Sequence, residues 1–234
     1  MDSQTSRKRI IQKLADKNFN DLHRFRGLGE DPVYHQQIVE NRFQPFPDTK
    51  GYNDFFAVSW KGLRLLKDPE TQATYHNLLW ELKPKTIVEL GVYSGGSLVW
   101  FRDLAKAFGF SCTVVGVDID LSRCQIQEDD MSGIKLIKGD CNFPENINLG
   151  KLEHPILFID DAHCNTFNVL KYAIVSDIVR TGDYFVIEDT MPMWRRYSPK
   201  TLQFNLGAFS DLMVLDSLYS NTCPQLKDGV FKII

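Results

Sequence analysis

Residues 86–97 read TIVELGVYSGGS, an apolar run followed by a glycine-rich loop. The run, Thr86–Leu90, is apolar on both faces, which is typical of a strand buried in a parallel sheet. A helical pattern over Ser97–Phe108 follows, so the loop joins a strand to a helix. Glycine lets the backbone approach a ligand closely, and the loop has Gly91, Gly95 and Gly96. The stretch predicts the first βα unit of an α/β domain with a ligand site at the loop.

The same alternation of strands and helices continues on both sides of this stretch. Asp68-Pro69 opens a helix, with Asp68 as cap and Pro69 in the first turn, and Lys83-Pro84 ends it. Another helical pattern covers Thr166–Val179. Further strands are expected at Thr113–Val117, Ile134–Ile137, Pro155–Ile159, Tyr184–Ile187, Met213–Leu215 and Val230–Ile233. The order predicts a doubly wound, mostly parallel Rossmann-like α/β sheet of seven strands.

Composition limits the classes of function. The chain has 234 residues, a net charge of −3, and 43% hydrophobic and 24% charged residues, so we expect a globular protein that binds neither nucleic acid nor a membrane. The five cysteines include no Cys-x-x-Cys pair, which favours reduced thiols in the cytoplasm. Residues 1–50 are polar and rich in turn-forming residues, so we predict an N-terminal arm or lid before a single domain over 51–234.

Carboxylates end the predicted strands, where ligands bind in such sheets. The loop after Glu89 is not a dinucleotide fingerprint, because Tyr93 replaces the middle glycine, and it suits S-adenosylmethionine (SAM) better. Glu89 would contact the methionine ammonium. Asp118 would bind the ribose or cap the turn at Leu121, and Asp140 would bind adenine or form an Asx turn. The candidate cofactor residues are Glu89, Gly91, Tyr93, Ser94, Gly95, Ser97, Asp118, Asp140 and Cys141.

A second group of carboxylates points to a metal. Asp160 ends one strand, and Glu188 and Asp189 follow the next, so three carboxylates are expected to converge at adjacent strand ends. Such a cluster needs a cation, and oxygen ligands favour Mg²⁺, with Mn²⁺ or Ca²⁺ as alternatives. His163, expected one helical turn after Asp160, would be a general base or a structural histidine. Asp161 is interpreted as a cap for the following helix.

The stretch Thr190–Lys200 is too irregular for a helix and follows the proposed metal ligands. Its residues include Arg195 and Arg196, which would bind an anionic group of a substrate. The alternative is a solvated loop with a packed Trp194.

Together these residues resemble a known family. The segments that carry the resemblance are Phe25–Pro32, Val88–Ser97, Asp120–Ile126, Phe158–His163 and Ile187–Asp189, and they are similar to the cephalosporin hydroxylase family. The resemblance implies a SAM-binding fold with an antiparallel seventh strand, Mg²⁺ at Asp160, Glu188 and Asp189, and a homo-oligomer, expected to be hexameric. Related sugar O-methyltransferases use a histidine base at the position of His163.

The sequence therefore predicts a SAM- and Mg²⁺-dependent O-methyltransferase with Asp160 and His163 as catalytic residues. The acceptor would be a natural-product hydroxyl: the 7-hydroxyl of a cephalosporin, or a sugar or peptide hydroxyl. The five histidines form no recognisable iron site, so a separate hydroxylase partner would install the hydroxyl. The alternatives are a nicotinamide-dependent oxidoreductase and a SAM-binding protein without catalysis.

Overall fold

The computed structural model describes residues 59–190, 206–220, 226 and 229–234, all within the compact unit Phe56–Ile234. The predicted arm over 1–50 and residues 191–200 of the predicted substrate loop lie outside the described residues. No helix in the described part is long and apolar enough to cross a membrane. The helices and strands are β1 (Ser59–Trp60), β2 (Leu63–Arg64), α3 (Pro69–Leu82), β3 (Thr86–Leu90), α4 (Gly96–Ala107), β4 (Thr113–Asp118), β5 (Ile134–Lys138), β6 (Ile156–Asp160), α5 (Thr166–Val175), β7 (Tyr184–Ile187), β8 (Met213–Leu215), α7 (Ser217–Ser220) and β9 (Val230–Ile233).

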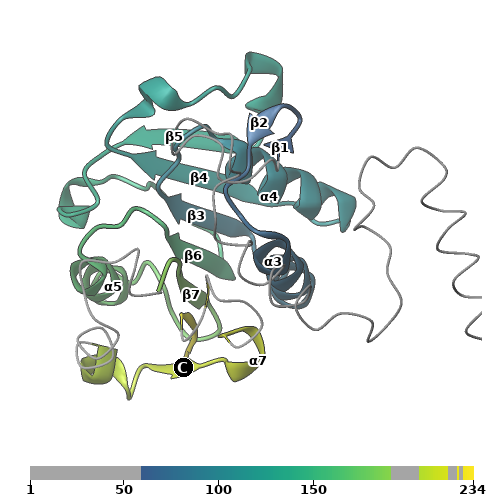
Figure 1. The fold of residues 1–234 in the computed structure, drawn as a ribbon. Coiled ribbons are helices and arrows are strands. Elements are labelled where there is room, and N and C mark those ends of the chain that lie inside the picture. Colours follow the sequence, from purple (N-terminus) through teal and green to yellow (C-terminus); the bar gives the residue numbers. More distant parts are fainter. Residues whose placement is uncertain (1–58, 191–205, 221–225, 227–228) are drawn as a thin grey trace, which may run out of the picture. The chain divides into compact units, whose positions relative to one another are not determined.

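The seven-stranded sheet has the order β5-β4-β3-β6-β7-β9-β8 (Figure 1). The first five of these strands are parallel, and β9 runs antiparallel to both β7 and β8. The chain reverses its direction of winding between β3 and β6, which is where ligands bind in such sheets. The predicted Rossmann-like α/β fold with an antiparallel seventh strand is confirmed.

The helices follow from local chemistry. Asp68 caps α3 by accepting hydrogen bonds at 2.8 Å from the backbone N–H of Glu70 and Thr71, as predicted. Lys83 ends α3 in the left-handed conformation. The helix α5 ends at Val175, four residues earlier than predicted, because Ser176 caps it and Asp177 turns left-handed.

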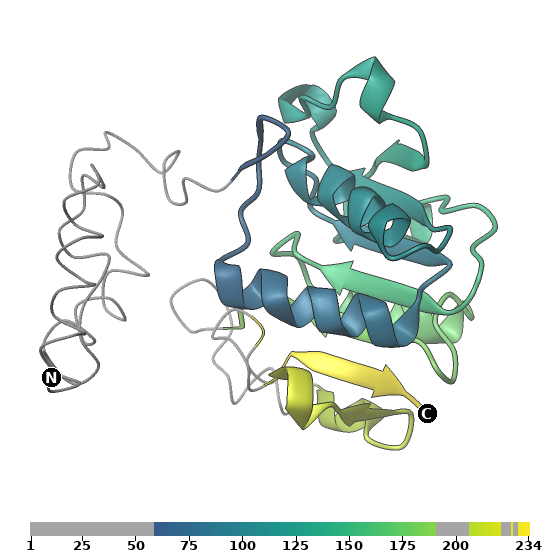
Figure 2. The same ribbon diagram turned by 90° about the vertical axis from the view of Figure 1, so that its right-hand side faces the viewer.

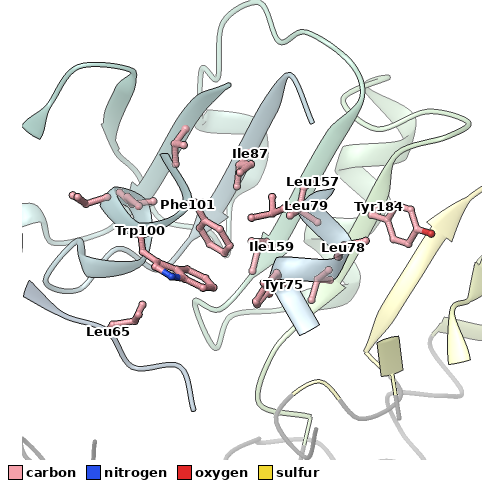
Figure 3. Close-up of a cluster of buried hydrophobic side chains, with 14 of the residues drawn as sticks. Leu65, Tyr75, Leu78, Leu79, Ile87, Trp100, Phe101, Leu157, Ile159 and Tyr184 are labelled. Carbon is pink, nitrogen blue, oxygen red and sulfur yellow. The ribbon is translucent and has the colours of Figure 1, made fainter. Parts of the chain in front are cut away.

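Two hydrophobic layers cover the sheet. The helices α3 and α4 pack on one face, and α5 packs on the other (Figure 2). On the first face the ring of Tyr75 meets Phe101 edge-on, with the ring centroids 5.1 Å apart, beside the buried Trp100 (Figure 3). Side chains of β3, β6 and β7 alternate between the two layers, and this alternation also decides where the polar side chains at the strand ends point.

Candidate active site

Three carboxylates lie on the sheet face that α3 and α4 cover. The residue two positions earlier in each strand packs in the core on that face; these residues are Ile87, Ile159 and Val186. Since strand side chains alternate, Glu89, Asp161 and Glu188 point to the same side. We call these three residues the inner cluster, and their nearest oxygens lie within 4.8 Å of one another.

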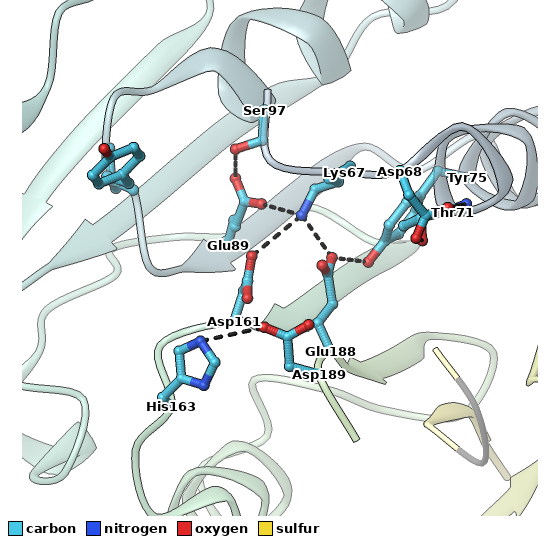
Figure 4. A network of polar contacts seen from close by, with 12 residues as sticks. Lys67, Asp68, Thr71, Tyr75, Glu89, Ser97, Asp161, His163, Glu188 and Asp189 are labelled. Atoms are coloured by element: carbon cyan, nitrogen blue, oxygen red, sulfur yellow. Dashed lines mark hydrogen bonds and ion pairs between the residues drawn. The ribbon is translucent and has the colours of Figure 1, made fainter. Parts of the chain in front are cut away.

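The ammonium of Lys67 lies at the centre of the inner cluster (Figure 4). Its Nζ is 2.7 Å from Glu188 Oε1, 3.1 Å from Glu89 Oε1 and 3.3 Å from Asp161 Oδ2. Tyr75 Oη donates a hydrogen bond to the same Glu188 oxygen. Sequence reasoning missed Lys67, which belongs to the segment between β2 and α3 and is almost fully buried.

The charges of this network are strongly coupled. Burial opposes the charge of Lys67, but Glu188, Glu89 and Asp161 hold the pKa of the ammonium well above its usual value. Burial also raises the pKa of Asp161 and Glu188; Lys67 opposes the shift at both, and at Asp161 the neighbouring Glu188 adds to it. Three carboxyl groups thus share one ammonium, and the raised pKa values of Asp161 and Glu188 reflect burial and mutual repulsion that a further cation would offset.

A second group, the outer cluster, comprises Asp161, His163 and Asp189, again with ligand atoms within 4.8 Å of one another. Asp189 Oδ2 is 3.3 Å from Nε2 of His163. The side chains of Asp161, Asp189 and His163 are 21%, 20% and 47% exposed, so solvent reaches all three. Two accessible carboxylates beside an imidazole fit the ligand preferences of a divalent cation such as Mg²⁺ or Mn²⁺.

Backbone strain accompanies the outer cluster. His163 and Asp189 have φ angles of +52° and +53°, and Tyr93 in the glycine-rich loop has +47°. Non-glycine residues in this region cost free energy and concentrate at functional sites. These are three of the six described non-glycine residues with a positive φ; the other three, Lys61, Lys83 and Asp177, lie at turns or a helix end.

The structure does not bring Asp160 into either cluster, although it was predicted as a metal ligand. Asp160 belongs to the opposite face, where its carboxylate accepts hydrogen bonds from Thr166 Oγ1 at 2.6 Å and Cys164 Sγ at 3.6 Å. Asp161 takes the expected place beside Glu188 and Asp189. The predicted cap role of Asp161 is wrong, because Asn165 caps α5. His163 lies in a loop before α5, so the predicted helical turn between Asp160 and His163 is also wrong.

Asp118 braces the glycine-rich loop. Its Oδ2 accepts hydrogen bonds from the backbone N–H of Val92 at 2.8 Å and Tyr93 at 3.1 Å, and its Oδ1 accepts one from the N–H of Asp120 at 2.9 Å. The alternative role as cap of the turn at Leu121 is wrong, because Asp120 caps that turn. The contact of Asp118 with a ribose stays a prediction.

The loop glycines are explained by contacts within the protein. A Cβ at Gly91 would lie 2.6 Å from the carbonyl oxygen of Asp161, and one at Gly96 would lie 1.9 Å from that of Arg64. At Gly95, which has a φ angle of +85°, a Cβ would lie 2.4 Å from Ile126 Cγ1. The absence of a side chain at Gly91 thus allows the loop to pack directly against the backbone of Asp161, the residue that both clusters share.

Glu89, Ser94, Ser97 and Asp140, which are also candidate cofactor residues, have hydrogen-bond partners within the protein. The buried Glu89 accepts a hydrogen bond from Ser97 Oγ at 2.6 Å, and the hydroxyl of Ser94 donates to the Arg64 carbonyl at 2.9 Å. Asp140 forms the alternative Asx turn by accepting from the backbone N–H of Asn142 at 2.9 Å. Burial raises the pKa of the Cys141 thiol to about 12. Their contacts with SAM stay predictions.

The family model described as Rhamnosyl O-methyltransferase/CmcI matches residues 53–196 of the chain. The chain belongs to this family. CmcI is a member of the cephalosporin hydroxylase family, so the predicted resemblance is confirmed.

Solved structures of CmcI are similar over most of their length. CmcI with Mg and SAM is 48% identical, with a TM-score of 0.72, over 95% of this chain and 99% of that one. The rhamnosyl O-methyltransferase of Mycobacterium leprae is 28% identical over 143 residues, and the chain spans 61% of its length. The Podospora anserina methyltransferase PaMTH1, at 15% identity and a TM-score of 0.51, shares the fold.

Proposed function

We propose that the chain is a SAM- and divalent-metal-dependent O-methyltransferase that acts on a hydroxyl of a natural product. The observation that carries the proposal is the outer cluster, where two accessible carboxylates and His163 meet beside the glycine-rich loop. The similarity of the chain to CmcI, whose structure has been solved with Mg and SAM, supports both cofactors.

The residues present fit both groups. Asp161 and Asp189 would hold the metal, with the Glu188 carboxylate behind them, and the loop over Gly91–Ser97 braced by Asp118 would hold SAM. SAM supplies the methyl group, and the metal stabilises negative charge on the acceptor oxygen. His163 would remove the proton of the acceptor hydroxyl, while Asp189 keeps its imidazole oriented and stabilises the protonated ring. Holding the two reactants together would supply much of the rate.

For the acceptor we propose the 7-hydroxyl of a cephalosporin first and a sugar hydroxyl second. Identity to CmcI is 48% over nearly the whole chain, against 28% over part of it for the rhamnosyl O-methyltransferase. We also propose that a separate hydroxylase installs the hydroxyl, because the five histidines of the sequence form no recognisable iron site. We further propose that the chain works as a homo-oligomer, which rests on the resemblance to the family.

The test is a turnover assay with purified protein, SAM and Mg²⁺, in which S-adenosylhomocysteine and methylated product are followed by mass spectrometry. A 7-hydroxycephem and a rhamnoside are the two acceptors, and an unhydroxylated cephem is the control. Methylation of the 7-hydroxycephem alone supports the first acceptor, and methylation of the rhamnoside alone replaces it with the second. No product from either, with SAM bound in calorimetry, would favour a binding protein, and binding of NADH but not SAM would favour an oxidoreductase.

A further inference from the structure

The inner and outer clusters share one carboxylate, that of Asp161. Two groups of ligands joined by a common carboxylate are also the layout of two-metal sites, in which the ions lie about 3.5–4 Å apart. Here the ammonium of Lys67 lies among the oxygens of the inner cluster, within 3.3 Å of all three of its residues. The inner position is therefore filled by a cation that the chain itself carries.

We propose that Lys67 is a built-in cation that replaces one ion of a two-ion layout and restricts the site to a single divalent metal. It is a positioning residue, because it acts on the metal through the carboxylates and not by contact with substrate. The inference rests on the proposed function in one respect, the role of the outer cluster as a metal site. The position of Lys67 within the inner cluster is observed directly and does not depend on the proposed function.

The fold fixes the ammonium independently of any ligand. The Lys67 carbonyl accepts a hydrogen bond from Gln72 Nε2 at 2.7 Å, and the next residue, Asp68, caps α3. Nζ also lies 5.6 Å from the ring centroid of Tyr75 and 5.9 Å from that of Phe101. Aromatic faces attract an ammonium, so both the carboxylates and the rings around Nζ favour its positive charge.

Lys67 also determines how the shared carboxylate is presented. Asp161 directs Oδ2 toward Lys67, and the backbone of Asp161 is hydrogen-bonded to Leu90 at the end of β3. A single positive charge at this oxygen does not neutralise Asp161 and Asp189 together, so the outer cluster still attracts one divalent ion. Lys67 thus fixes the orientation of Asp161 while keeping the outer cluster attractive to one divalent ion.

The test is the number of Mn²⁺ ions bound per chain, measured by equilibrium dialysis and by the rise in melting temperature with Mn²⁺. The wild type and Lys67→Arg should bind about one ion. Lys67→Ala should bind about two and gain more thermal stability from Mn²⁺, because three carboxylates then need a replacement cation. Lys61→Ala is the matched control, since Lys61 also contacts two carboxylates, those of Asp103 and Asp130, but is half exposed. It should bind the wild-type number.

The outcomes separate this inference from the proposed function. No ion in the wild type but one in Lys67→Ala would reject the proposed metal site and support the role of Lys67. Equal numbers in the two proteins, or two ions in the wild type, would overturn the inference. If Lys67→Ala folds only with Mn²⁺, the inference is supported. If Lys67→Ala does not fold at all, the double variant Lys67→Ala/Glu89→Gln, which removes one carboxylate charge, is measured in its place. A double variant that binds the same number of Mn²⁺ ions as the wild type would overturn the inference.

Discussion

The carboxylate of Asp118 lies 2.8 Å from the backbone nitrogen of Val92, across the glycine-rich loop and 26 residues away in the chain. Asp118→Ala should therefore weaken SAM binding, because it frees the N–H groups of Val92 and Tyr93. Each hydrogen bond to a charged group contributes roughly 1.5–3 kcal/mol. Calorimetry measures the change. Asp120→Ala is the control, since Asp120 is exposed and caps only a short turn, and equal affinities in both variants would reject the role of Asp118.

Asp160 and Asp161 should behave differently despite being adjacent. Asp161→Asn should lower Mn²⁺ affinity and turnover, because Asp161 belongs to the outer cluster. Asp160→Asn should keep Mn²⁺ affinity but lower the free energy of unfolding by about 1–3 kcal/mol, because the buried carboxylate holds Thr166. Dialysis and chemical denaturation measure the two effects. Loss of Mn²⁺ binding in Asp160→Asn alone would restore Asp160 as the ligand.

His163→Ala should reduce turnover by about 10²–10⁴, the usual contribution of a positioned base. Affinity for SAM should change little, because the imidazole faces Asp189 in the outer cluster. Single-turnover kinetics with saturating SAM measure the chemical step directly. A variant with wild-type turnover would show that His163 is structural.

Gly96→Ala should destabilise the protein by at least about 1–3 kcal/mol, the usual cost of overpacking. Its Cβ would meet the Arg64 carbonyl, which is backbone and cannot rotate away. Gly207→Ala is the matched control, because a Cβ there meets nothing within 4 Å. Urea denaturation of both variants measures the difference, and equal midpoints would show that the β2 segment yields to the new methyl group.

Cys112 should resist alkylation in the folded protein. Burial raises the pKa of its thiol to about 12, so at pH 8 only about one molecule in ten thousand carries the reactive thiolate. Raising the pH toward 12 should increase the rate as the thiolate forms. Peptide mass spectrometry after brief iodoacetamide treatment measures this, with guanidinium-unfolded protein as the control. Rapid labelling of folded protein at pH 8 would contradict the prediction.

The strands were predictable because their signal is local. Four strands were predicted with the bounds that the structure has: Thr86–Leu90, Tyr184–Ile187, Met213–Leu215 and Val230–Ile233. Each is a short run made up mostly of apolar and β-branched residues, and such runs can be recognised without knowledge of their partner strands.

The choice between Asp160 and Asp161 needed one further step that the sequence allowed. Counting in twos along β6 from Leu157 and Ile159 leads to Asp161, just as counting along β3 from Ile87 leads to Glu89. Proximity to the strand end favoured Asp160, but the alternation of side chains decides which face a carboxylate reaches.

Lys67 could not be found in this way. It stands before a helix cap in a segment with several basic residues, and a lysine there is usually solvated. Its partner Glu188 is 121 residues away, and only the assembled sheet brings the two side chains together.

The position of β9 has a consequence for synthesis on the ribosome. The strand β7 consists of four buried residues, and in the described part of the chain its edge away from β6 is paired only by β9. Because β9 is translated more than 40 residues after β7 ends, the nascent chain exposes an unpaired apolar edge throughout that interval. Such edges are templates for aggregation. A chain truncated before Val230 would therefore need a chaperone to stay monomeric.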